Sequence, residues 1–215
     1  MQHEITQAIP LLDEQGELTQ PGWARRLLPV YDRSKVRGGP LRLKERDCYL
    51  VMNRQCALAL TISDNRYMGM DSISLIDLWE GWQVTRSPMR LMPLGGTGLP
   101  QSSLRGSCAG RGYGLLFQHE GEGRTLHAHM DRFRDGQALD AQILLTQEPE
   151  ESIVMCTPFE KPGQFYFNQK INCMRAQGKV TLGDREYVFD PEDSFAVLDW
   201  GRGVWTCRST WYWGS

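Results

Sequence analysis

The stretch QCALALTISD, residues 55–64, decides the fold class, because its side chains alternate in character along the chain. A period of two over ten residues predicts a β-strand with one buried face. That face carries the apolar side chains Cys56, Leu58, Leu60 and Ile62. The DNR sequence at 64–66 predicts a tight turn into a second alternating stretch, residues 67–82.

The same pattern continues toward the C-terminus. Residues 114–147 predict three strands joined at 120–123 and at 135–136, and the simplest assembly of these strands is a meander. The sequence GKVTLGDREYVF, residues 178–189, predicts a hairpin with a Gly-Asp turn. No part of residues 41–213 has the pattern of a long amphipathic helix. Many short strands with turns about every ten residues predict an all-β sandwich or barrel built from strongly curved sheets.

Three segments follow from these patterns. Residues 1–40 are rich in proline and glycine and predict an irregular N-terminal arm that wraps the core. We expect residues 41–150 to form a first β-barrel-like domain, and residues 151–215 to begin a second one. Residues 92–114 have no periodicity and predict a long loop or a flap at a barrel mouth.

Composition excludes several classes of partner. The 215 residues include 24 basic and 26 acidic side chains, and this near balance lacks the excess of positive charge typical of nucleic-acid binders. The N-terminus does not resemble a secretory signal, and no apolar run approaches a membrane span, so we expect a soluble cytoplasmic protein. The six cysteines have wide, unpatterned spacings, which favour reduced thiols. Nothing in the sequence favours a particular oligomeric state.

Two histidines in LHAHMD, residues 126–131, form the one candidate metal site. His127, His129 and Asp131 would share one face of a strand, and His119 across the hairpin is another candidate ligand. The alternative is a polar strand face turned toward solvent, and the pattern favours this alternative. We therefore predict no metal or other cofactor.

The sequence DWGRGVW, residues 199–205, is the strongest candidate for chemistry. Asp199 and Arg202 lie three residues apart in a segment crowded with aromatic side chains, the candidate ligand-binding residues Trp200, Trp205, Trp211, Tyr212 and Trp213. A carboxyl group beside aromatic walls suits a general acid or a group that stabilises a carbocation. The alternative is a structural Asp-Arg pair that ties a glycine turn to the core.

These residues resemble a known family. The opening ITQAIPLLDEQGELTQPGWARRLLPVYDR, the strand KERDCYLVMN and the sequence DWGRGVW followed by WYWGS resemble a microbial family known as domain of unknown function 2804. Members of that family continue well past the W-x-W sequence. The resemblance therefore implies that this chain is an N-terminal portion of a longer protein, and that its tryptophans belong to the middle of a β structure.

A second, more distant resemblance concerns the segment from Gly178 through VTLGDREY to LDW. It is similar to the two-barrel lipocalin-like enzymes typified by carotenoid hydratases and certain cyclases. The resemblance implies a lipocalin-like antiparallel barrel with a hydrophobic cavity. A fold likeness alone does not establish a reaction.

Together these observations predict a protein that binds a lipophilic small molecule in a β-barrel cavity. If the protein is an enzyme, we expect cofactor-free hydration, isomerisation or cyclisation, with Asp199 as the proton donor and Arg202 setting its orientation and pKa. The alternative function is a non-catalytic binding or protein-interaction module, in which the Asp-Arg pair is structural.

Overall fold

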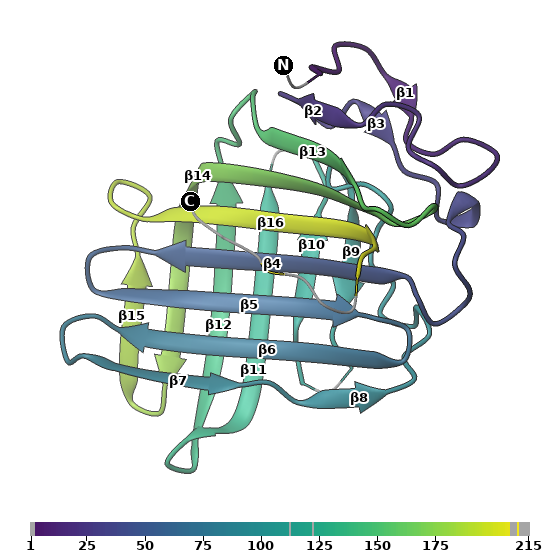
Figure 1. Cartoon of the computed structure of the whole chain (residues 1–215). Helices are drawn as coiled ribbons and strands as arrows, with labels where there is room; N and C mark the ends of the chain where they lie inside the picture. Colours follow the sequence, from purple (N-terminus) through teal and green to yellow (C-terminus); the bar gives the residue numbers. More distant parts are fainter. Residues whose placement is uncertain (1–2, 112, 122, 207–209, 211–215) are drawn as a thin grey trace.

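The computed structural model describes residues 3–111, 113–121, 123–206 and 210 of the chain (Figure 1). These residues form sixteen strands and one short 3-10 turn, so the predicted all-β class is confirmed. No helix in this part of the chain has the length and apolar character needed to cross a bilayer.

Most strands belong to one large sheet that folds over into two crossing layers (Figure 1). The order within the first layer is β7-β6-β5-β4-β16, and β8 pairs with the edge of β6. The bounds in this layer are β4 (Lys44–Met52), β5 (Cys56–Asp64), β6 (Met68–Asp77), β7 (Trp82–Arg86), β8 (Met89–Leu91) and β16 (Phe195–Val204). The second layer contains β9 (Gly106–Ala109), β10 (Leu116–His119), β11 (Arg124–Arg134), β12 (Gln137–Thr146) and β15 (Arg185–Phe189).

Strand β14 (Phe165–Leu182) joins the two layers. Its first half pairs with β16 and with β13 (Ile153–Pro158), and its second half pairs with β12 and β15. The register with β16 shifts between Ile171 and Met174, and Cys173 has a left-handed φ of 63° there. An extra residue of this kind bends a strand and increases its twist. The bulge therefore turns the sheet from one layer into the other.

The strand pairing crosses residue 150. Strand β16 lies between β4 and β14 in the sheet order, and β14 pairs with β12. Within the part of the chain that the structure describes, strands of residues 151–206 thus pair with strands of residues 41–150 in one sheet. Local patterns predict the strands themselves, but they do not say which strands become neighbours.

The core lies between the two layers. The predicted inner face of β5 is confirmed, because the four apolar side chains from Cys56 to Ile62 are all fully buried. The two layers also contact each other through β7 and β11. The Arg86 Nε on β7 donates to the Phe133 carbonyl oxygen on β11 at 2.8 Å, and the Arg134 guanidinium on β11 lies 3.8 Å from the ring centroid of Trp82 on β7. The sheet order of the described strands runs from β7 to β9 without closing into a barrel.

The N-terminal segment packs along one end of the sheet (Figure 1). Its elements are β1 (Ile9–Pro10), β2 (Gly22–Ala24), β3 (Pro29–Val30) and the 3-10 turn η1 (Arg33–Lys35). Strand β2 pairs with β13, and the side chains of Tyr31 and Arg33 both donate to the buried carboxylate of Glu45 on β4. The arm is therefore anchored both by backbone pairing and by a buried charge.

Candidate functional site

Alternation along β16 separates the residues of DWGRGVW onto two faces. Successive side chains of a strand point to opposite faces of the sheet. Asp199 consequently shares the outer face with Gly201, while Trp200 and Arg202 point into the core between the layers. Asp199 and Arg202 therefore lie on opposite faces of the sheet, because residues three apart on a strand point to opposite sides of it.

Arg202 is a structural residue of the core. Its side chain is fully buried, and its Nη1 donates to the Asp47 carboxylate at 2.8 Å and to the Arg46 and Gly201 carbonyl oxygens. Its Nε and Nη2 both donate to the Pro100 carbonyl oxygen, at 3.2 and 2.8 Å. Pro100 belongs to the long loop predicted at residues 92–114. Arg202 therefore fastens that loop to β4 and β16.

Asp199 pairs with two cations on the outer face instead. Its Oδ2 accepts from the Arg46 Nη2 at 2.6 Å, and its Oδ1 lies 3.0 Å from the Lys170 Nζ. Strands β4 and β14 flank β16, so these cations approach the carboxylate from both sides. The Asp199 side chain is only 4% exposed, whereas that of Arg46 is 41% exposed. A buried carboxylate needs such partners, because burial without them is costly.

A cavity of about 580 Å³ lies next to this charge cluster. Its volume is in the range of sites that hold a small organic molecule. Residues from five neighbouring strands and from the segment after β16 line it: Arg46, Cys48, Leu50, Ala59, Met155, Thr157, Tyr166, Asn168, Lys170, Asp199 and Trp205. Most of this lining is apolar or uncharged, and the charged groups belong to the Asp199 cluster.

Tyr166 forms part of the wall beside Asp199. Its ring packs edge-on against Trp205 with centroids 5.1 Å apart. A Cβ on Gly201 would lie 2.8 Å from the Tyr166 Oη, so a glycine is needed here to let the ring cross the strand. Burial and, to a smaller extent, the Asp199 charge raise the pKa of Tyr166 to about 12. The phenol is therefore protonated at neutral pH and can donate a hydrogen bond.

The other groups of the site carry defined protonation states. Burial lowers the pKa of Arg46, but the Asp199 charge and Tyr166 outweigh this effect and leave that pKa raised, so the guanidinium stays charged. Burial raises the pKa of the Cys48 thiol, which disfavours the reactive thiolate. The cavity thus offers a charged cluster and a neutral phenol, but no activated nucleophilic cysteine among its described residues.

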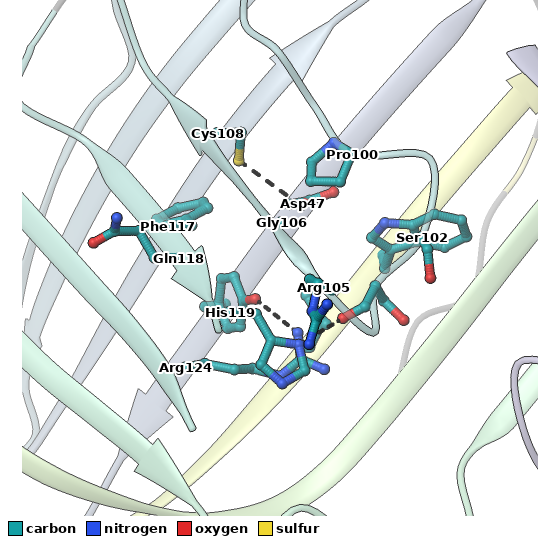
Figure 2. Close-up of a pocket in the computed structure, with 14 residues that line it drawn as sticks. Asp47, Pro100, Ser102, Arg105, Gly106, Cys108, Phe117, Gln118, His119 and Arg124 are labelled. Atoms are coloured by element: carbon teal, nitrogen blue, oxygen red, sulfur yellow. Dashed lines mark hydrogen bonds between the residues drawn. The ribbon is translucent and has the colours of Figure 1, made fainter. Parts of the chain in front are cut away.

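A second, polar cavity lies on the core side of the sheet (Figure 2). Asp47 and Cys108 face each other there, with the Cys108 Sγ 3.9 Å from the carboxylate, and the His119 Nδ1 lies 3.0 Å from the Ser103 carbonyl oxygen. Its volume is only about 10 Å³. Such a space holds one water molecule at most. It is therefore part of a buried polar network and not a substrate site.

The structure describes two of the five aromatic residues that were predicted to bind a ligand, Trp200 and Trp205. Trp200 is fully buried in the core, where it packs against Phe167 and the Arg202 guanidinium, so it does not line the large cavity. Trp205 does line that cavity. The other three predicted ligand-binding residues lie outside the described residues: Trp211, Tyr212 and Trp213.

The histidine face of β11 behaves as a polar surface. Both ring nitrogens of His129 are engaged, with Nδ1 2.6 Å from the Asp140 Oδ1 and Nε2 3.1 Å from the Asp131 Oδ1. His127 pairs with Leu116 in the register of the hairpin, whereas His119 pairs with Arg124 at its far end. No group of three or more metal-ligating side chains occurs in the described ranges of the chain.

Sequence reasoning missed most of the residues around Asp199. The signal was present in FYFNQKI, residues 165–171, where Tyr166, Asn168 and Lys170 alternate with Phe165, Phe167, Gln169 and Ile171, which are apolar except for Gln169. A lysine within such an alternation indicates a polar group on a mostly covered face. Arg46 lies in a run of charged residues at the start of KERDCYLVM, where no such alternation distinguishes it. Only the sheet order brings these two residues to the same carboxylate.

The chain belongs to the family described as a domain of unknown function, DUF2804, whose model matches residues 2–215. The predicted family membership is thereby confirmed. No curated protein sequence matches the chain significantly.

Two solved structures share the fold at low sequence identity. An AttH-like protein from Nitrosomonas europaea has a TM-score of 0.50 and 8% identity, over 82% of this chain and 56% of that one. Kievitone hydratase from Nectria haematococca has a TM-score of 0.51 and 10% identity, over 91% of this chain and 57% of that one. The chain thus spans a little over half the length of these structures.

Proposed function

We propose that this chain belongs to a lipocalin-like protein that binds a small, largely apolar molecule in the outer cavity. The single observation that carries the proposal is the cavity of about 580 Å³ with one charge cluster in an otherwise mostly uncharged wall. Ligand sites in proteins typically combine apolar lining with a few polar groups that orient the ligand. The cavity has this composition.

We propose further that the site performs cofactor-free acid-base chemistry of the hydration, isomerisation or cyclisation type. Tyr166 is protonated at neutral pH and would donate a proton or a hydrogen bond to the ligand. Asp199 lies between two cations, so it would hold Arg46 and Lys170 in position beside the ligand in place of the proton-donor role expected from the sequence. Because one fold neighbour is a hydratase, hydration is the first reaction to test.

The binding proposal is tested by a fluorescence titration of the purified chain with fatty acids and isoprenoid alcohols. Trp205 lines the cavity, so a ligand should change its emission, and Trp205→Phe should remove that part of the signal. Ala59 also lines the cavity, and Ala59→Phe should weaken binding by about tenfold or more because it fills the space. The matched control is Ala138→Phe, at a half-buried alanine on β12 that does not line the cavity.

Two results would contradict the proposal. One is a panel in which no compound changes the fluorescence. The other is a loss of binding that is equal in Ala59→Phe and Ala138→Phe, because then the effect would not come from the cavity.

A further inference from the structure

Positive charges outnumber negative charges among the described residues that line the outer cavity. Two of the described lining residues are cations, Arg46 and Lys170, and one is an anion, Asp199. The excess of one positive charge lies in a wall that is otherwise uncharged. An interior of low dielectric constant strengthens the attraction of such an excess for an anion and its repulsion of a cation.

The arrangement of the two cations suits a carboxylate in particular. They already hold one carboxylate, that of Asp199, from opposite sides at 2.6 and 3.0 Å. The guanidinium of Arg46 carries several N–H donors in a planar fork, so it can bind a second carboxylate while it holds the first. With 41% of its side chain exposed, Arg46 is also the most accessible member of the cluster.

The apolar part of the wall and the volume of the cavity determine the character and the size of the rest of the ligand. Leu50, Ala59, Met155 and Trp205 offer hydrocarbon and aromatic surface. If each non-hydrogen atom takes roughly the 30 Å³ that a water molecule occupies in the liquid, the cavity holds on the order of 20 such atoms. A fatty-acid-sized molecule fits within that limit.

We infer that the natural ligand is an amphipathic carboxylate, whose carboxylate binds at Arg46 and Lys170 while its apolar part fills the remainder of the cavity. This inference rests on the proposed function, since it names the chemical class of the ligand for the same cavity. Asp199 competes with the ligand for the two cations, and so it sets how tightly the anion is held.

The first test compares three probes that share a ten-carbon chain: decanoate, 1-decanol and decyltrimethylammonium. Calorimetric titration at pH 7.5 should give decanoate a Kd about tenfold or more below that of the alcohol, and the cation should bind most weakly. Equal affinities for decanoate and the alcohol would overturn the carboxylate inference and leave the binding proposal standing. Failure of all three probes to bind would count against the binding proposal itself.

The second test changes the charges one at a time. Lys170→Met and Arg46→Met should each raise the Kd for decanoate by about tenfold and leave that for 1-decanol within about twofold. The matched control is Lys179→Met, a lysine on the same strand that pairs with Glu186 at the surface and does not line the cavity. Circular dichroism establishes that each variant is folded.

Asp199→Asn gives the most discriminating result. It removes the competing anion and leaves both cations, so decanoate should bind about tenfold more tightly than to the unaltered chain. A purely structural role for Asp199 would not strengthen binding. Weaker binding of decanoate to a folded Asp199→Asn variant would overturn the inference.

Discussion

Replacement of Arg202 by methionine tests whether this residue is structural. In the folded protein its guanidinium is fully buried and donates to the Asp47 carboxylate and to three carbonyl oxygens. Arg202→Met leaves Asp47 and the Pro100 carbonyl without that donor in the core. Removal of one partner of a buried ion pair costs about 4 kcal/mol. For a chain of this length, such a loss lowers the Tm by roughly 8–16 °C.

Urea denaturation followed by far-UV circular dichroism measures this loss directly. The control is Arg26→Met, which breaks an exposed ion pair with Glu150 and should change the free energy of unfolding by less than about 1 kcal/mol. If Arg202→Met is destabilised as little as the control, the buried network does not hold the loop at Pro100, and the assignment of Arg202 to the core is refuted.

Three further perturbations follow from the same geometry. Gly201→Ala should lower the Tm by several degrees because its Cβ would meet the Tyr166 ring, and the double variant Gly201→Ala/Tyr166→Leu should recover most of the loss; a loss that persists would argue against this clash. Hydrogen bonds that the protonated His129 ring donates to Asp140 and, to a smaller extent, to Asp131 raise the pKa of His129, so its stabilisation is present below pH about 6.5 and is lost as the pH rises through the raised value. An NMR titration should show this raised pKa, and Asp140→Asn should lower it; an unchanged value in that variant would contradict the assignment. Burial raises the pKa of Asp77, but hydrogen bonds to its carboxylate outweigh burial and leave that pKa lowered, so the stability from Asp77 is present above its unfolded pKa and is lost as the pH falls. Asp77→Asn should therefore flatten the acid side of the curve of stability against pH, and an unchanged slope would contradict this.

The strands of this fold could be predicted from local sequence because hydrophobic alternation is a local property. The inner face of β5 and the Gly183-Asp184 turn of the β14-β15 hairpin both lie where the pattern predicted them. The order of the strands could not be predicted in this way. Strand β16 lies between β4 and β14, and that order depends on contacts across the whole chain.

The candidate site could be predicted from the sequence only in part. Alternation along DWGRGVW places Asp199 and Arg202 on opposite faces of a strand. The true partners of Asp199 could not be found from the sequence alone. Arg46 lies 153 residues away along the chain, and only the register of β4 against β16 brings it to the carboxylate.

The rate of cysteine alkylation shows whether a ligand occupies the outer cavity beside Asp199. Cys48 is half-buried and lines the cavity, whereas Cys173 is exposed and lies outside it. Because burial raises the pKa of Cys48, labelling with N-ethylmaleimide is best measured at pH 8.5 by mass spectrometry of the separate peptides. Saturating decanoate should slow labelling of Cys48 by about tenfold and leave that of Cys173 unchanged. Labelling of Cys48 at the same rate with and without bound decanoate would contradict this expectation.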